Sequence, residues 1–367
     1  MMKLLMTADT VGGVWDYSLE LSTALGEHGV SVVLATMGAP LSESQWAEVR
    51  RIHNVSVRES TFALEWMPSP WSDVDRASEW LLDLERREHP DIVHLNGYAH
   101  GALPWRAPTV VAAHSCVRSW WEAVRGEQAP TEWDEYTRRA RAGFDATDVI
   151  VTPSRAMGEA VRRHYAPATE PIVVHNGRAG PYRRGDKSHF VLTAGRVWDE
   201  GKNVAALVRV ADAIPWPVYV AGSTVSPHKR VTALGSTQPL GKLPAAELAE
   251  WMSHAAIYAL PARYEPFGLS VLEAALSGCA LVLGDIPSLR ELWGDAALFV
   301  DPDDHDTLAT TITWLTEDAP MRRALSARAS HVALRFTPAR MATGYLEVYE
   351  RAASAHALRT RSVACAS

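Results

Sequence analysis

Cysteine is scarce in this sequence, and no apolar stretch is long enough to cross a membrane. The three cysteines, Cys116, Cys279 and Cys365, are odd in number and lie far apart, so their spacing suggests neither a disulfide framework nor a metal cluster. The apolar run within the first ten residues is too short for a signal-peptide core, and no later run approaches the length of a membrane span. We therefore expect a cytoplasmic protein with reduced thiols.

Positive charge is in deficit as well. The chain has 36 Lys and Arg against 43 Asp and Glu, a formal net charge of -7 at pH 7. This balance argues against nucleic acid or an anionic membrane as the main partner, and leaves a local basic groove open. The 367 residues are 47% hydrophobic, and chains of this length usually divide into two domains.

Short apolar runs rich in β-branched residues alternate with segments of helical period, which predicts an α/β protein with doubly wound parallel sheets. In the first half the runs are 3–7, 30–37, 91–96, 109–114, 148–154 and 171–177. A segment rich in Gly, Pro and charge follows Gly177 and is interpreted as a linker. The pattern then resumes at 189–195, 217–222, 257–262, 280–284 and 297–300.

This pattern divides the chain into three parts. We predict one Rossmann-like domain over residues 1–178, a second over 187–340, and a C-terminal helix over 341–367 that packs back on the first domain. Open parallel sheets bind ligands at the carboxyl ends of their strands. We therefore expect the two domains to face a central cleft, and the chemistry to lie where the strand ends meet.

The most informative motif follows a predicted strand of the second domain. Glu265 and Glu273 stand eight residues apart, and Gly268 between them opens a predicted helix. The amides of Phe267, Gly268 and Leu269 would then be donors for hydroxyl or phosphate oxygens. The two carboxylates have the spacing to contact two hydroxyl groups of one extended ligand, such as a sugar and a ribose. Taken alone, two solvated carboxylates are the simpler interpretation.

Two cations stand in the loop after the predicted strand 189–195. Arg196 offers a fork of N–H donors and Lys202 a mobile point charge, and together they would neutralise the charge growing on a leaving diphosphate. Such a pair by itself is normally solvated charge. With these cations no metal ion is needed, and we interpret the acidic segment 301–304 as a helix N-cap rather than a metal site.

These motifs resemble those of the retaining GT-B glycosyltransferases of family four, which carry a Glu, seven residues, Glu motif and a Gly-Arg and Lys pair. The resemblance spans essentially the whole chain and implies the GT-B fold, with the acceptor side in the N-terminal domain and the donor side in the C-terminal domain. It implies that Glu265 contacts the donor sugar and that Glu273 binds the ribose. Asn203 departs from the family, because many relatives have glycine after the lysine.

Three further sites carry weaker signals. Gly12 and Gly13 follow the first strand without forming a GxGxxG fingerprint, and the resemblance implies that they approach the donor, although a tight turn explains them equally well. His114 ends the run 109–114, where the family commonly places a histidine beside the donor sugar; a structural histidine is the alternative. Leu243 lies in a segment that resembles the one whose backbone reads the nucleotide base in relatives.

The resemblance implies a metal-independent hexosyltransferase whose co-substrate is a UDP- or GDP-sugar and which has no other cofactor. Its catalytic residues would be Glu265, His114, Arg196 and Lys202, and its acceptor a glycan, a lipid-linked sugar or a small molecule. The alternatives are an inactive sugar-nucleotide or glycan binding protein, and a related GT-B epimerase or phosphorylase.

Six tryptophans of the first half are open to three interpretations, namely an acceptor wall, a peripheral membrane contact or ordinary packing. They are Trp66, Trp71, Trp80, Trp120, Trp121 and Trp133.

Overall fold

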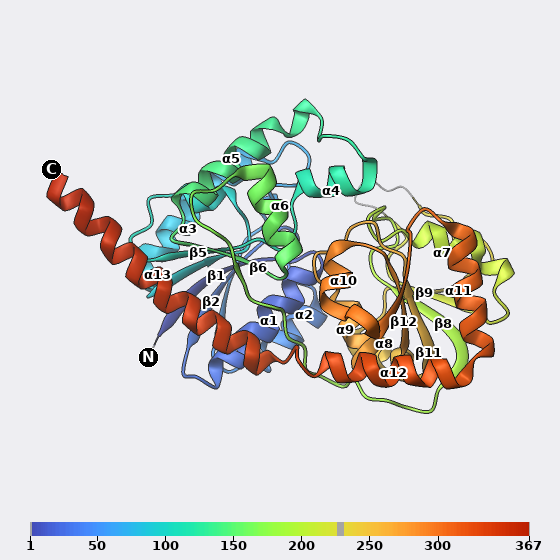
Figure 1. Cartoon of the computed structure of the whole chain (residues 1–367). Helices are drawn as coiled ribbons and strands as arrows, with labels where there is room; N and C mark the ends of the chain where they lie inside the picture. The colour runs from blue at the N-terminus through green and yellow to red at the C-terminus, as the bar shows by residue number, and fades with distance from the viewer. Residues whose placement is uncertain (1, 226–230, 367) are drawn as a thin grey trace. The chain divides into compact units, whose positions relative to one another are not determined.

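The computed structural model describes residues 2–225 and 231–366 and divides the chain into two compact units (Figure 1). Unit 1 comprises Met1–Ser119, Gln128–Gly177 and Pro338–Ser367, and unit 2 comprises Trp120–Glu127 and Arg178–Thr337. Each unit contains one parallel β-sheet with helices between its strands. The prediction of two doubly wound parallel sheets is confirmed.

The sheet of unit 1 has seven strands in the order β3-β2-β1-β4-β5-β6-β7, and each pair of neighbours is parallel. The strands are β1 (Lys3–Asp9), β2 (Ser31–Met37), β3 (Val55–Glu59), β4 (Ile92–Leu95), β5 (Thr109–Ala112), β6 (Val149–Thr152) and β7 (Ile172–Val173). The apolar runs predicted every one of these strands except β3. Because β3 lies at the edge of the sheet and alternates apolar with polar residues, it lacks the continuous apolar run of a buried strand.

Helices cover both faces of this sheet, and the side chains of each strand alternate between the two layers. In β1, Leu4 and Met6 belong to one core cluster, whereas Leu5 belongs to the other. The first cluster includes residues of α1, α2 and α13, and the second includes residues of α3, α5 and α6. The helices are α1 (Gly13–Gly26), α2 (Glu43–Val49), α3 (Trp71–Glu88), α5 (Asp134–Ala146), α6 (Arg155–Tyr165) and α13 (Pro338–Ala366), with short 3-10 helices η1 (Ala99–Ala102) and η2 (Thr131–Trp133).

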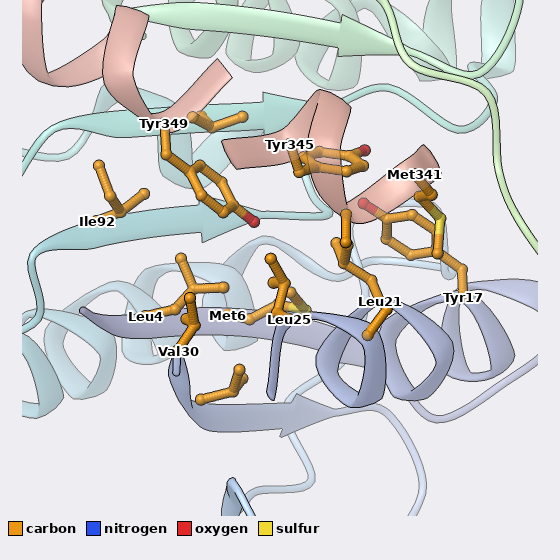
Figure 2. Packing of buried hydrophobic residues seen from close by; sticks show 14 of the residues in the cluster. Leu4, Met6, Tyr17, Leu21, Leu25, Val30, Ile92, Met341, Tyr345 and Tyr349 are labelled. Atoms are coloured by element: carbon orange, nitrogen blue, oxygen red, sulfur yellow. The ribbon is translucent and has the colours of Figure 1, made fainter. Parts of the chain in front are cut away.

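The C-terminal helix α13 completes the first of these clusters. Figure 2 shows Tyr345 and Tyr349 of α13 above the strands, with Met341 beside Tyr17 of α1. Tyr345 and Tyr349 are 1% and 0% exposed, so they are as deeply buried as the strand residues Leu4 and Met6. Unit 1 therefore depends on a segment that lies more than 150 residues beyond its last strand.

The sheet of unit 2 has six parallel strands in the order β10-β9-β8-β11-β12-β13. They are β8 (Ser188–Ala194), β9 (Val218–Ala221), β10 (Gln238–Gly241), β11 (Ala255–Leu260), β12 (Ala280–Gly284) and β13 (Ala297–Val300). The apolar runs predicted five of these strands and missed β10, an edge strand whose sequence Gln-Pro-Leu-Gly has little strand propensity.

Two helical layers cover this second sheet. One core cluster joins α8, α9, α10 and α12 to β8, β11 and β12, and the other joins α7 and α11 to the opposite face of the same strands. The helices are α7 (Val204–Val210), α8 (Ala245–His254), α9 (Leu269–Leu276), α10 (Pro287–Trp293), α11 (His305–Glu317) and α12 (Ala319–Ala333), with 3-10 helices η3 (Ala211–Ala213) and η4 (Gly294–Ala296). A further helix, α4 (Val117–Arg125), begins in unit 1, and its residues from Trp120 onward are grouped with unit 2.

Within the described residues, every helix falls short of the combined length and apolar character that a bilayer span requires. Cys116 and Cys279 are free, buried thiols, and burial raises the pKa of Cys279 to about 11. The side chain of Cys365 lies outside the described residues.

Candidate active site

The loops after β8 and β11 bring two of the predicted site residues together in unit 2. These strands are neighbours in the parallel sheet, so their carboxyl ends open on the same edge. Lys202 follows β8 and Glu265 follows β11, and the ammonium nitrogen of Lys202 forms an ion pair with Oε2 of Glu265. Their side chains are only 17% and 9% exposed, so each charge depends on the other for compensation.

Arg196, in the same loop as Lys202, pairs with a carboxylate that the sequence interpretation did not include. Its Nη2 donates to Oδ2 of Asp199 at 2.7 Å, and its guanidinium carbon lies 5.6 Å from the ring centroid of Trp198. The other carboxylate oxygen of Asp199 accepts the Gly201 amide at 2.9 Å. Burial opposes ionisation of Asp199, but the charges of Arg196 and Lys202 outweigh it and hold the pKa of Asp199 below its ordinary value. Asp199 thus fixes both the loop backbone and the Arg196 side chain.

The backbone conformation and contacts of Asn203 explain why asparagine can stand where many relatives have glycine. Its φ of 53° lies in the left-handed region, where glycine is the easiest residue and asparagine the next most tolerated. Its side-chain amide donates to the carbonyls of Pro261 and Pro302 at 2.9 and 2.8 Å, and its Oδ1 accepts from Arg263 at 2.5 Å. Asparagine therefore keeps the backbone conformation and also ties the loop of Lys202 to the loops after β11 and β13.

Gly268 sets the start of helix α9 beside Glu265. Its φ of 89° lies in the left-handed region, which favours glycine. A Cβ at this position would lie 3.1 Å from Val271 and 3.3 Å from the Glu265 side chain. Leu269 is the first residue of α9, so the amides of this first turn have no acceptor one turn earlier in the helix. Phe267 is buried, and its ring packs edge-on against Phe336 at 5.5 Å.

Glu273, the second carboxylate of the motif, lies within α9 and is 6% exposed. Its Oε1 accepts Nε of Arg178 at 2.7 Å, and Nη2 of Arg178 donates to the Tyr182 hydroxyl at 3.1 Å. Burial and the nearby Glu273 carboxylate raise the pKa of Tyr182, so this phenol stays protonated. The structure thus places Glu273 in a buried polar cluster that the sequence interpretation did not include.

The segment around Leu243, predicted to contact the nucleotide base, comprises the edge strand β10 and the turn after it. Leu243 lies between β10 and α8, is half-buried, and packs against the core cluster of α8 and α9. At the end of the neighbouring strand β9, a Cβ on Gly222 would lie 1.8 Å from the carbonyl oxygen of Gly195. Glycine at 222 therefore allows the ends of β8 and β9 to approach each other.

In unit 1, Gly12 and Gly13 form the turn between β1 and α1. Gly12 has a φ of 104°, and Gly13 is the first residue of the helix. Both are exposed, and the carboxylate of Asp9 accepts the amide of Val11 at 2.6 Å just before them. The tight-turn interpretation of Gly12 is therefore correct, and the turn leaves backbone accessible at the carboxyl end of β1.

His114 follows β5 at the same edge of the unit 1 sheet, and its hydrogen bonds define its tautomer. Asn96 donates its side-chain amide to the carbonyl of Thr7 at 2.7 Å, so its Oδ1 faces Nε2 of His114 at 2.8 Å. Burial lowers the pKa of His114 to about 4, so the ring is neutral at pH 7. Nε2 therefore carries the proton, and Nδ1 is an acceptor suited to a hydroxyl group. The ring of Tyr17 packs edge-on against His114 at 4.3 Å.

The predicted residues therefore fall into separate groups. In unit 2, Arg196 pairs with Asp199 and Lys202 pairs with Glu265, and the charge of Lys202 also acts on Asp199, so these residues form one cluster of charges. Glu273 belongs to a second cluster with Arg178. His114 and the Gly12–Gly13 turn belong to unit 1. Sequence interpretation missed Asp199, although its place three residues after Arg196 in the same loop was a usable signal.

The acidic segment 301–304 serves as a helix cap. Oδ1 of Asp304 accepts the Thr307 amide at 2.9 Å at the start of α11, and Asp303 pairs with Arg263. The N-cap interpretation is confirmed. In the described part of the chain, His, Cys, Asp and Glu side chains do not gather in groups of three or more that could hold a metal ion.

The six tryptophans are all half-buried. Trp71, Trp80 and Trp133 pack against the core cluster of α3, α5 and α6, and Trp66 packs against a smaller cluster around Leu64. Trp120 and Trp121 contact each other edge-on at 5.8 Å. Ordinary packing therefore accounts for at least four of the six.

Curated proteins of known activity resemble this chain over different lengths. The glycogen synthase of Mycobacterium tuberculosis is 26% identical over 370 residues, which cover 87% of this chain and 86% of that protein. The O-antigen chain mannosyltransferase B of Escherichia coli is 32% identical over 122 residues, which cover 33% of this chain and 32% of that protein.

Solved structures match the fold along almost the entire chain. The sucrose-phosphate synthase of Thermosynechococcus elongatus has a TM-score of 0.79 at 16% identity and covers 96% of this chain and 99% of its own. HepE of Anabaena, solved in complex with UDP-glucose, has a TM-score of 0.75 at 16% identity and covers 95% of this chain and 100% of its own. The chain therefore has the GT-B fold of these glycosyltransferase structures.

Family models match both halves of the sequence. Residues 11–178 match the model described as Glycosyltransferase Family 4, and residues 180–332 match the model described as Glycosyl transferases group 1. The chain belongs to glycosyltransferase family 4.

Proposed function

We propose that this family 4 glycosyltransferase takes a hexosyl group from a UDP- or GDP-sugar and transfers it, with retention of anomeric configuration, to a hydroxyl group of a glycan, lipid-linked or small-molecule acceptor. The observation that carries the proposal is the charged cluster of Arg196, Lys202 and Glu265 at the carboxyl edge of the unit 2 sheet. HepE, which shares the fold, binds UDP-glucose in its solved complex.

In this proposal Arg196 and Lys202 bind the two phosphoryl groups of the donor. Lys202 pairs with Glu265, and a diphosphate would offer it a more highly charged partner. Glu265 is then available to accept hydrogen bonds from the hydroxyl groups of the donor sugar. The first-turn amides at Gly268 and Leu269 supply neutral donors beside it.

The reaction proposed for this site breaks the bond between the anomeric carbon and the leaving phosphate oxygen. The acceptor oxygen forms the new bond on the same face of the sugar, and its proton passes to the leaving diphosphate. Arg196 and Lys202 stabilise the charge that grows on the diphosphate, so the protein contributes position and electrostatics rather than a covalent intermediate. His114, neutral and with Nδ1 as an acceptor, would bind a sugar hydroxyl rather than act as a general acid.

Thermal unfolding with UDP, GDP and ADP tests the donor assignment. A nucleotide at a hundred times its dissociation constant should stabilise the protein by about 2.7 kcal/mol, which corresponds to roughly 5 to 11 °C for a domain of the size of unit 2. Arg196→Ala and Lys202→Ala should each remove most of this shift, because each deletes a charge-assisted contact to phosphate. Unchanged shifts in both variants would contradict the assignment.

The stereochemistry needs a separate measurement once a donor is known. Proton NMR of the first product formed reports its anomeric configuration, and an inverted product would refute retention. Donor binding without either transfer or hydrolysis would favour the alternative of an inactive sugar-nucleotide binding protein.

A further inference from the structure

We propose that Arg178 is a positioning residue that orients the Glu273 carboxylate for the ribose of the donor and thereby makes the enzyme selective for ribonucleotides over 2′-deoxyribonucleotides. This inference rests on the proposed function, a UDP- or GDP-sugar donor, and takes Glu273 as the residue that the family resemblance assigns to the donor ribose. Arg178 belongs neither to the motif of two glutamates nor to the Arg-Lys pair that identified the site. It follows Asn176 and Gly177, at the start of the predicted linker.

Arg178 is fixed at its backbone and along its side chain. Its amide donates to the carbonyl of Phe336 at 3.1 Å, and Phe336 packs edge-on against Phe267 at the start of α9. Its guanidinium donates from Nε to Glu273 and from Nη2 to the Tyr182 hydroxyl. Only 12% of its side chain is exposed, so the ion pair with Glu273 is largely shielded from solvent.

This geometry leaves Glu273 able to bind a ligand as well. A carboxylate has about four acceptor positions on its two oxygens; the Nε–H of Arg178 takes one, on Oε1, and the Tyr182 hydroxyl is within reach of another. The N–H donors of arginine lie in a rigid plane, so the hydrogen bond from Nε favours one orientation of the carboxylate. The guanidinium also compensates the charge of the buried Glu273 carboxylate, whose oxygens can accept hydrogen bonds from the two ribose hydroxyl groups.

Tyr182 supports the same arrangement. Its hydroxyl accepts from Arg178 and lies within hydrogen-bonding reach of Glu273, and its ring centroid is 5.6 Å from the guanidinium carbon. Three side chains of unit 2 thus form one cluster around the buried Glu273, which the half-buried Arg178 and Tyr182 hold in place. Such a cluster restricts the carboxylate more than an isolated ion pair would, because each member limits the motion of the others.

Isothermal titration calorimetry with nucleoside diphosphates and their 2′-deoxy analogues tests the proposal, using whichever of UDP, GDP and ADP binds the wild type best. The wild type should prefer the ribonucleotide by about ten- to a hundredfold, the value of one hydrogen bond to a charged group. Arg178→Gln should reduce this preference to about threefold or less, and Arg178→Lys, which keeps the charge but not the planar donor, should be intermediate. Because the preference is a ratio measured on one sample, partial unfolding of a variant does not change it.

Two further variants separate the failure of this inference from the failure of the proposed function. Glu273→Gln should lose the ribose preference, whereas Arg196→Ala should weaken both nucleotides and keep it. If Glu273→Gln loses the preference and Arg178→Gln keeps it, the role of Arg178 is overturned while the proposed function stands. Tighter binding by Arg178→Gln would also overturn it, because Arg178 would then compete with the ribose. A wild type without any preference would overturn the ribose assignment itself.

Discussion

Replacing Lys202 by methionine tests whether the Lys202–Glu265 pair stabilises unit 2 as well as preparing the donor site. Methionine keeps most of the length and apolar surface of the lysine side chain but removes its charge. Glu265 then remains in place with 9% of its side chain exposed and without its cationic partner. Breaking a buried ion pair from one side typically costs 3–5 kcal/mol, and the 17% exposure of Lys202 places the expected loss at the lower end, about 3 kcal/mol.

The double variant Lys202→Met with Glu265→Gln is the matched control. It removes both charges, so no buried carboxylate is left uncompensated, and we expect it to recover about 2 kcal/mol of the loss. Differential scanning calorimetry should show a decrease of roughly 6 to 12 °C in the unfolding temperature of unit 2 for the single variant. Hydrogen exchange of peptides from β8 and β11 assigns that decrease to unit 2. If the single and double variants unfold at the same temperature, the two side chains do not compensate each other and the reasoning is wrong.

Two further predictions concern the two sheets separately. Burial lowers the pKa of His94 to about 3 and that of His100 and His114 to about 4. Near pH 6.5 these imidazoles therefore take up protons only when unit 1 is unfolded. The free energy of unfolding of unit 1 is at its full value above about pH 6.5 and should fall by roughly 1–2 kcal/mol per histidine by about pH 5. Urea unfolding at pH 7, 6 and 5 measures this slope, and a flat profile would contradict it. In unit 2, Gly222→Ala should cost more than about 3 kcal/mol because its Cβ would overlap the Gly195 carbonyl, whereas Gly241→Ala, with a φ of 68° and open space around it, should cost only about 1 kcal/mol. Equal thermal stability of the two alanine variants would refute the steric argument.

The sequence predicted the buried part of each sheet and missed parts of the edges. Strands such as β1 and β11 are buried on both faces, so they appear as continuous apolar runs. The edge strands β3 and β10 are short and carry polar residues, proline or glycine, and such sequences do not differ from those of loops.

The candidate site was predictable only where its members share a local pattern. The spacing of Glu265 and Glu273, and of Arg196 and Lys202, is visible in single loops or helices. The contacts between elements are not visible in this way. Lys202 and Glu265 are 63 residues apart, and Arg178 and Glu273 are 95 residues apart. The first pair forms because β8 and β11, distant in the sequence, end at one edge of a sheet, and the second joins the segment before β8 to helix α9.

The burial of α13 in unit 1 has a consequence for how the chain folds during synthesis. The residues from 178 to 337 form most of unit 2 and emerge from the ribosome before α13 does. Unit 1 has all of its strands by Val173, yet Tyr345 and Tyr349, which complete one of its two cores, are translated after unit 2. We therefore expect unit 2 to reach its native state on the nascent chain, while unit 1 stays incompletely packed until α13 has been translated.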